Sequence, residues 1–312
     1  MRQLGKSDLS LSEVGIGCNN FGGRLGLEES RAVVHKALDL GINFFDTADY
    51  YGNRGGSEEY LGKILGPRRN DVVVATKFGL EMYPGAEGAS RAYIMSAVEQ
   101  SLRRLKTDYI DLYQLHWPDP KTPMSETLEA LGDLVRSGKV RYIGCSNLMA
   151  WQVIDALWIS RTAGFPAYVS CQEEYNIASR GIEREMLPAM KAFGLGLVPY
   201  SPLASGVLSG KYRRGQEKPP GSRLANSGQL AAEHLSDHNL DVVAFLEPIC
   251  AATGLTMIEV AISWLLARPV VASVIAGAST PAQVEQNMRA SRAKLPAEYL
   301  AQIDERFAPK AR

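Results

Sequence analysis

Four residues of the sequence are of types that together can move a proton: an aspartate, a tyrosine, a lysine and a histidine. Asp46 and Tyr51 stand in the segment DTADYYGNRGGSE, directly after the apolar run INFF, whereas Lys77 ends VVVATK and His116 ends IDLYQLH. A tyrosine hydroxyl has an unperturbed pKa of ~10 and is a poor acid–base catalyst near neutral pH. A nearby lysine favours the phenolate and lowers that pKa, and a paired aspartate keeps the lysine charged and in place.

The remaining member of this set is a hydrogen-bond donor. A neutral histidine can hold a carbonyl oxygen while the tyrosine gives that oxygen a proton. The chemistry is then carbonyl reduction, and it needs a hydride donor from outside the protein. His234 and His238 stand at helical spacing in EHLSDH, but the pattern favours a solvated piece of loop, so no metal is expected.

The elements that must position these residues are short apolar runs without clean alternation, typical of parallel strands covered on both faces. The predicted strands are Val14–Cys18, Ile42–Thr47, Val72–Lys77, Ile110–His116, Arg141–Ser146, Tyr168–Gln172, Gly196–Tyr200 and Ser273–Gly277. The predicted helices are Glu28–Gly41, Tyr93–Lys106, Ser125–Lys139, Trp151–Ala163, Arg184–Phe193, Val242–Ala252, Ile258–Ala267 and Pro281–Ala290. Eight strand–helix units in 312 residues predict an α/β fold, a (β/α)8 TIM barrel with long loops on its C-terminal face.

A doubly wound open sheet is the competing fold. Its dinucleotide fingerprint G-x-G-x-x-G is incomplete here, because GIGCNNFGG has Asn20 where the third glycine would stand. No change of composition marks a boundary, so residues 1–312 are predicted to form a single barrel domain. The irregular stretch Ser201–Asn239 is too long for a simple connection and predicts a lid or binding loop.

Composition narrows the classes of partner. Lys plus Arg and Asp plus Glu both number 34, so the formal net charge is zero, which argues against binding to nucleic acid or to an anionic membrane. The four cysteines form no C-x-x-C pair, as in a reduced cytoplasmic protein. No apolar segment is long enough to span a bilayer, and no signal peptide is visible. A cytoplasmic location is therefore expected.

In a parallel barrel the carboxyl ends of all strands open on one face, which holds the active site in characterised barrel enzymes. The predicted strands finish there on polar residues, namely Asp46, Lys77, His116, Ser146 with Asn147, Gln172 and Tyr200. Each alone has an ordinary structural explanation, such as a turn, a packed ring or a solvated tip. Their convergence on one rim favours a site.

Several segments together resemble the aldo-keto reductase superfamily, in order and across nearly the whole chain: FFDTADYYG, VVVATK, LYQLHWPD, IGCSN, VPYSPLASGVLSGKY and IAGASTPAQVEQN. The resemblance implies a barrel that binds an extended nicotinamide dinucleotide without a Rossmann domain. It implies a catalytic tetrad of Asp46, Tyr51, Lys77 and His116, in which Tyr51 is the proton donor and Asp46 positions the lysine.

The resemblance also implies the cofactor contacts. Ser146, Asn147 and Gln172 would hold the carboxamide, Tyr200 would stack on the nicotinamide, and the loop Ser201–Lys211 would cover the pyrophosphate. The full predicted set is Ser146, Asn147, Gln172, Tyr200, Ser201, Leu203, Ser205, Gly206, Lys211, Gly277, Ser279, Gln283 and Asn287. For the substrate, an aromatic pocket wall is expected from Phe21, Tyr50, Tyr83 and Trp117.

The sequence departs from the family at the 2′-phosphate of the cofactor. Where many members have a Lys-Ser pair and an arginine, this chain has Gly277, Ala278 and Gln283. The helix start with its hydroxyls still favours an anion, so NADPH is expected, with a preference over NADH within ~10² in kcat/KM and NAD also accepted. Alternatively, Arg213, Arg214 or Arg223 supplies the charge from the long loop.

The predicted function is an NAD(P)H-dependent carbonyl reductase or alcohol dehydrogenase acting on a small aldehyde, ketone or sugar-like substrate. The alternative is a non-catalytic, cofactor-sensing binding subunit on the same fold, because fold does not determine function. A phosphate-sugar isomerase is disfavoured, since the chain lacks a phosphate-binding fingerprint. The sequence specifies neither the natural substrate nor the oligomeric state.

Overall fold

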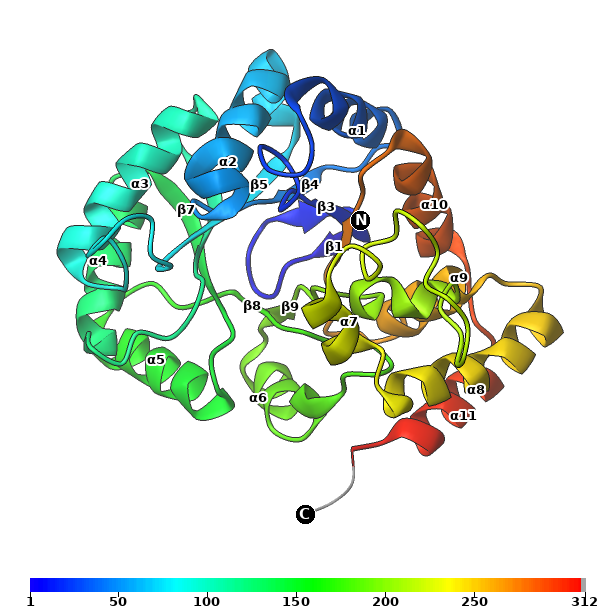
Figure 1. Ribbon diagram of the computed structural model, residues 1–312. Helices are drawn as coiled ribbons and strands as arrows, with labels where there is room; N and C mark the ends of the chain where they lie inside the picture. Colours follow the sequence, from blue (N-terminus) through cyan, green and yellow to red (C-terminus); the bar gives the residue numbers. More distant parts are fainter. Residues whose placement is uncertain (310–312) are drawn as a thin grey trace.

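Eight parallel strands form the centre of the molecule in a computed structural model that describes residues 1–309 (Figure 1). They are β3 (Val14–Gly17), β4 (Phe44–Asp46), β5 (Val73–Phe78), β6 (Ile110–Leu115), β7 (Val140–Ser146), β8 (Ser170–Gln172), β9 (Gly196–Leu197) and β10 (Val274–Gly277). The strand order is β10-β3-β4-β5-β6-β7-β8-β9, with every pair parallel. All eight predicted strands are confirmed. Residues 310–312, part of the predicted domain, lie outside the described residues.

The sheet closes on itself between β9 and the segment that leads into β10. The Leu197 amide donates to the Val270 carbonyl at 2.8 Å, and the Ala272 amide donates back to the Leu197 carbonyl at 2.9 Å. Further along, the Ile275 amide donates to the Pro199 carbonyl at 3.0 Å. These bonds close the eight-stranded sheet, and the predicted (β/α)8 barrel is confirmed.

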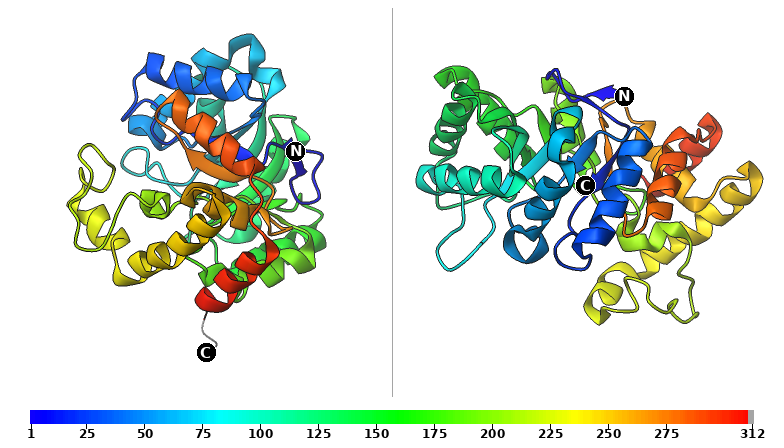
Figure 2. Two further views of the ribbon diagram at one scale, coloured as in Figure 1. Left: turned by 90° about the vertical axis from the view of Figure 1, so that its right-hand side faces the viewer. Right: turned by 90° about the horizontal axis from the view of Figure 1, so that it is seen from above.

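Helices surround the barrel (Figures 1 and 2). They are α1 (Leu27–Asp39), α2 (Tyr51–Leu65), α3 (Arg91–Leu105), α4 (Met124–Arg136), α5 (Ala150–Ala163), α6 (Met186–Phe193), α7 (Gly228–His234), α8 (Asp237–Thr253), α9 (Met257–Leu266), α10 (Pro281–Arg292) and α11 (Ala297–Phe307). Every predicted helix is present, but α2, α7 and α11 were not predicted. The α2 segment contains four glycines, which lower helix propensity and interrupt the apolar pattern from which a helix is predicted.

A short amino-terminal hairpin, β1 (Arg2–Gln3) with β2 (Ser10–Leu11), was also not predicted. Leu4, Leu9 and Leu11 from this hairpin pack with residues inside the barrel, including Phe44 and Val198. The hairpin and the long loop that follows β9 lie at opposite ends of the barrel (Figure 2). The hairpin therefore plugs the amino end, and the carboxyl end stays open for a site.

The long stretch Ser201–Asn239 is only partly irregular. It contains a 3-10 segment, η3 (Ala204–Ser209), then α7, and it leads into α8. Within residues 1–309 no single helix is long and apolar enough to cross a membrane; by length and composition alone, only the bent pair α8 and α9 reaches that threshold together.

Candidate active site

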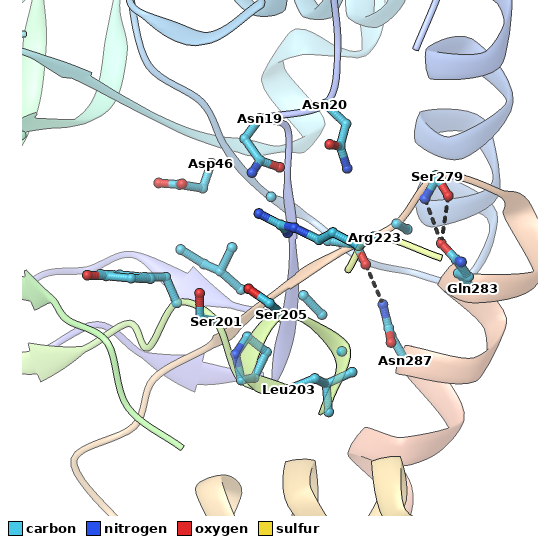
Figure 3. Close-up of a pocket in the computed structure, with 18 of the residues that line it drawn as sticks. Asn19, Asn20, Asp46, Ser201, Leu203, Ser205, Arg223, Ser279, Gln283 and Asn287 are labelled. Carbon is cyan, nitrogen blue, oxygen red and sulfur yellow. Dashed lines mark hydrogen bonds between the residues drawn. The ribbon is translucent and has the colours of Figure 1, made fainter. Parts of the chain in front are cut away.

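A cavity of about 670 Å³ opens at the carboxyl ends of the strands (Figure 3). Among the predicted site residues, those that line it are Asp46, Tyr51, His116, Trp117, Ser146, Asn147, Gln172, Tyr200, Ser201, Leu203, Ser205, Gly206, Lys211, Gly277, Ser279, Gln283 and Asn287. The strand ends, the long loop and α10 thus contribute to one space. The structure brings together residues that are more than 200 positions apart in the sequence.

Behind the cavity wall lies a buried ion pair between neighbouring strands. Lys77 Nζ donates to Asp46 Oδ2 at 2.7 Å and to the Thr47 carbonyl at 2.8 Å, and the Lys77 side chain is fully buried. Burial is the largest single influence and lowers the pKa of Lys77, but the Asp46 carboxylate and the neighbouring Tyr51 together outweigh it, so the pKa is raised and the ammonium stays charged. This matches the predicted pairing of the two residues.

Tyr51 lies over this pair and beside the histidine. Lys77 Nζ is 5.0 Å from the centre of the Tyr51 ring, and the Tyr51 hydroxyl lies 3.5 Å from His116 Nε2. Burial and the Lys77 charge lower the pKa of His116 to about 2, so its imidazole is neutral at physiological pH. A neutral imidazole can donate one hydrogen bond to a substrate oxygen.

The pKa of Tyr51 corrects one expectation. Lys77 lowers this pKa, as the sequence predicted, but burial of the hydroxyl is the larger influence and the net shift is upward. The reason is that the low-dielectric surroundings disfavour the phenolate more than a single ammonium can offset. Tyr51 is therefore fully protonated before it acts, which suits a proton donor.

The backbone after Tyr51 takes an unusual path. Gly52, Asn53 and Arg54 have φ values of 68°, 59° and 63°, which form a left-handed turn that non-glycine residues rarely adopt. The next helical turn is anchored by Glu58, fully buried, which accepts from Arg104 Nε at 2.7 Å and from the Thr76 hydroxyl at 2.6 Å. Glu58 and Arg104 thus fix the segment that carries Tyr51.

The strand ends β7 to β9 supply a row of amides and hydroxyls. Ser146 Oγ donates to the Gln172 carbonyl at 2.8 Å, and the Tyr200 hydroxyl donates to Asn147 Oδ1 at 2.8 Å. Gln172 Nε2 donates to Asp46 Oδ1 at 2.8 Å, so this row is joined to the ion pair of the tetrad. The four side chains line the cavity as a connected wall beside Tyr51.

The long loop closes the other side of the cavity. Ala204, Ser205 and Gly206 all have positive φ, a backbone form typical of anion-binding concavities. Lys211 and Arg223 extend from this loop among the lining residues, and Figure 3 shows the Arg223 side chain pointing into the cavity.

The three loop arginines differ in their partners. Arg213 pairs with Glu247 at 2.8 Å and Arg214 pairs with Asp241 at 2.9 Å, and neither lines the cavity. Within residues 1–309 Arg223 has no acidic partner at ion-pair distance. Its side chain reaches solvent, but partial desolvation by the surrounding loop, together with the nearby Arg24, lowers its pKa. Of the predicted alternatives, only Arg223 faces the site.

The start of α10 forms the far end of the cavity. The Ser279 amide and hydroxyl both donate to Gln283 Oε1, at 2.7 Å and 3.0 Å. Asn287 Nδ2 lies 3.5 Å from the Gly277 carbonyl (Figure 3). The Gln283 side chain therefore accepts the same Ser279 hydrogen bonds that were predicted to bind the 2′-phosphate of the cofactor.

The predicted aromatic wall does not assemble. Phe21 has no exposed surface and packs in the core, so the prediction that it lines the pocket is wrong. Tyr50 and Tyr83 are exposed but lie outside the lining, and only Trp117 contributes to it.

Sequence reasoning missed several lining residues from the loop after β3. Asn19, Asn20 and Arg24 line the cavity, and Asp46 is the only acid among the described lining residues. Their signal was weak, because a lone GGR or NN in a loop is ordinary turn composition. His238, raised as half of a metal pair, instead lies 3.0 Å from the Ala178 carbonyl, and no cluster of metal-binding side chains exists within residues 1–309.

A closed parallel barrel with a polar cavity at its carboxyl end defines the class of (β/α)8-barrel proteins. The chain belongs to the aldo/keto reductase family, whose model matches residues 13–307. The resemblance read from the sequence is therefore confirmed.

The relatives include named enzymes and named channel subunits. The chain is 36% identical to an L-glyceraldehyde 3-phosphate reductase of Escherichia coli (strain K12), over 98% of this chain and 92% of that protein. It is 36% identical to an uncharacterized oxidoreductase of Bacillus subtilis (strain 168), over 97% and 94%. It is also 39% identical to a probable voltage-gated potassium channel subunit beta of Oryza sativa subsp. japonica, over 93% and 90%. The family and the reductase and oxidoreductase relatives thus support an oxidoreductase function for this chain.

Proposed function

We propose that this protein is an NADPH-dependent carbonyl reductase or alcohol dehydrogenase of the aldo/keto reductase family, acting on a small aldehyde, ketone or sugar-like alcohol. The observation that carries the proposal is the buried contact of Lys77 with Asp46 beneath Tyr51, whose hydroxyl lies next to His116 Nε2. Packing of the barrel does not require four titratable groups at one rim. Their arrangement suits proton transfer to a carbonyl oxygen.

The lining suits a dinucleotide with phosphates. Asp46, its only acid, is paired with Lys77, whereas Arg24, Lys211 and Arg223 have no acidic partner within residues 1–309. The cavity therefore has an uncompensated positive charge that an anion can neutralise. A nicotinamide cofactor would be held by Gln172 and Asn147 at the tetrad end and by Arg223 and Gln283 at the other, and when bound it supplies the hydride. We assign the 2′-phosphate to Arg223 rather than to the start of α10.

The residues of the chain perform the proton step. Tyr51 gives its hydroxyl proton to the substrate oxygen as negative charge develops there, and Lys77 stabilises the phenolate left behind. Asp46 keeps Lys77 charged and fixed, so the ammonium needs no reorganisation at that moment. His116, neutral because of its low pKa, orients the substrate oxygen by a hydrogen bond.

A turnover assay tests this proposal directly. Purified protein is given NADPH or NADH with a panel of aldehydes, ketones and hydroxy-aldehydes, and cofactor oxidation is followed by absorbance. Turnover that disappears in Tyr51→Phe supports the assignment. Absence of turnover across the panel, with tight cofactor binding retained, would instead support the second candidate.

That second candidate is a cofactor-binding subunit of a larger assembly, favoured by the 39% identity to a probable channel subunit. Its test is co-purification with a membrane partner in a cofactor-dependent manner. We also propose a cytoplasmic location, supported by four cysteines that are all free thiols.

A further inference from the structure

Helix α5 carries large aromatic side chains on its solvent face. Trp151 and Trp158, one heptad apart, are 63% and 62% exposed, and Met149 just before the helix is 66% exposed. The opposite face holds Val153, Ala156 and Ser160 against the barrel. The neighbouring α4 differs, because its exposed positions carry polar residues such as Ser125, Glu129 and Arg136.

The charged residues of this face are arranged symmetrically about one tryptophan. Asp155 lies three residues before Trp158 and Arg161 lies three residues after it, each about 4.5 Å along the helix axis. Positions three apart share a helix face, so all three side chains point to solvent together. Neither Asp155 nor Arg161 has an ion-pair partner within the part of the chain that the structure describes.

We propose that α5 is the contact by which two copies of this chain form an antiparallel, two-fold symmetric dimer centred on Trp158. In that arrangement residue 158 faces its own copy, and residue 155 of one protomer faces residue 161 of the other. A Trp158 stack is then flanked by two Asp155–Arg161 ion pairs across the interface. A two-fold axis needs exactly such self-complementarity, since the same surface must serve on both sides.

The position of α5 permits this contact. It lies on the periphery between α4 and α6, outside the ring of strands (Figure 1). No residue of α5 lines the active-site cavity, so the dimer leaves both cavities open. Tryptophan at the centre of an interface contributes a large share of binding energy, whereas the flanking charges set orientation.

Analytical ultracentrifugation over a concentration series tests the dimer. Because a single-helix contact is at the small end of interface sizes, we expect self-association with a Kd on the order of 10–100 μM. Trp158→Ala is expected to weaken it by about 10-fold or more. Tyr83→Ala, which removes a comparably exposed aromatic ring elsewhere, is the matched control and is expected to leave it unchanged. A wild type that stays monomeric at about 1 mM, or a dimer unaffected by Trp158→Ala, overturns the proposal.

Exchanging the charges of Asp155 and Arg161 tests whether these two residues face each other across the proposed interface. Asp155→Arg and Arg161→Asp each place like charges opposite one another in their own dimers, so each is expected to be monomeric. Mixed in equal amounts, they form only opposite-charge pairs, and association is expected to return to within a few-fold of wild type. Thermal melts of both variants control for folding, and both positions are exposed. Failure of the mixture to associate would refute the Trp158-centred pairing.

Discussion

At the β4–β6 side of the cavity the charges of Asp46 and Lys77 are buried and paired, whereas across the cavity Lys211 and Arg223 are exposed and have no acidic partner within residues 1–309. A buried pair is costly to break, because each charge depends on the other once water is excluded. An exposed cation does not depend on a partner in this way, and it is stabilised when an anionic ligand binds beside it. The first side is built to act on a substrate atom, and the second to recognise a cofactor. Changes on the first side should therefore lower turnover and stability, and changes on the second should alter cofactor choice.

The largest effect on turnover, without an effect on cofactor binding, is expected from a change of Tyr51. Tyr51→Phe removes only the hydroxyl, so kcat is expected to fall at least ~10²-fold, the usual scale for a general acid. Cofactor affinity, measured by fluorescence titration, should change little because the ring remains. Tyr50→Phe is the matched control, since Tyr50 is adjacent in sequence but outside the cavity lining. Near-normal turnover in Tyr51→Phe would remove the basis of the proposed mechanism.

Lys77→Met tests whether the buried charges work as a pair. It leaves Asp46 buried without its partner, a change that typically costs ~3–5 kcal/mol of unfolding free energy. Asp46→Asn with Lys77→Met removes both charges and is expected to recover part of that loss in urea melts.

The single variant Lys77→Met is also expected to change the pH dependence of turnover. Lys77 lowers the pKa of Tyr51 against the larger effect of burial, so its removal should raise that pKa further. The alkaline limb of alcohol oxidation should then move to higher pH in Lys77→Met. An unmoved profile at full activity would show that Lys77 does not influence the proton donor.

On the opposite side, Arg223→Ala should affect the cofactor alone. We expect kcat/KM for NADPH to fall by about 10–10²-fold, because a charge-assisted contact is lost, with little change for NADH. Arg213→Ala and Arg214→Ala are matched controls, since both arginines are paired with acids outside the cavity. A loss of NADPH preference in a control, but not in Arg223→Ala, would contradict the assignment.

Gln283→Arg adds a charge where the present chain has an amide bound to Ser279. The preference for NADPH over NADH is expected to widen by a few-fold, about 1 kcal/mol, because Arg223 already supplies one cation. Steady-state kinetics with both cofactors measure this. A widening beyond ~10²-fold would show that the start of α10, and not the loop, is the main phosphate site.

The smallest effect is expected at Glu173, a buried residue that follows the cavity-lining Gln172 in the sequence but is not itself among the lining residues. Burial raises the pKa of Glu173 from 4.5 to about 8, and Glu173 Oε1 has no hydrogen-bond partner among the described residues 1–309. A carboxyl whose folded pKa is raised stabilises the fold fully below pH 4.5 and loses that contribution as pH rises through about 8. Glu173→Gln should therefore match wild type near pH 5 and melt a few degrees higher near pH 9. A pH-independent difference in melting temperature would rule out ionisation as its cause.

Much of the fold followed from local pattern. The eight strands and their common rim could be predicted because parallel, doubly covered strands are short apolar runs, as at Val14–Gly17. The hairpin β1–β2 could not, since two-residue strands have no detectable period. Helix α2 could not be predicted from the sequence, because glycines and a left-handed turn interrupt its beginning.

The sequence by itself determined which chemistry-bearing residues exist and that strand ends bring Asp46, Lys77 and His116 to one rim, because barrel topology makes all strands end on the same face. Only the tertiary structure decided which arginine faces the cavity, that Phe21 belongs to the core, and that burial outweighs Lys77 in the pKa of Tyr51. The physical reason is the same in each case. Burial, side-chain direction and ion pairing in loops depend on distant neighbours, and no local period of the chain encodes them.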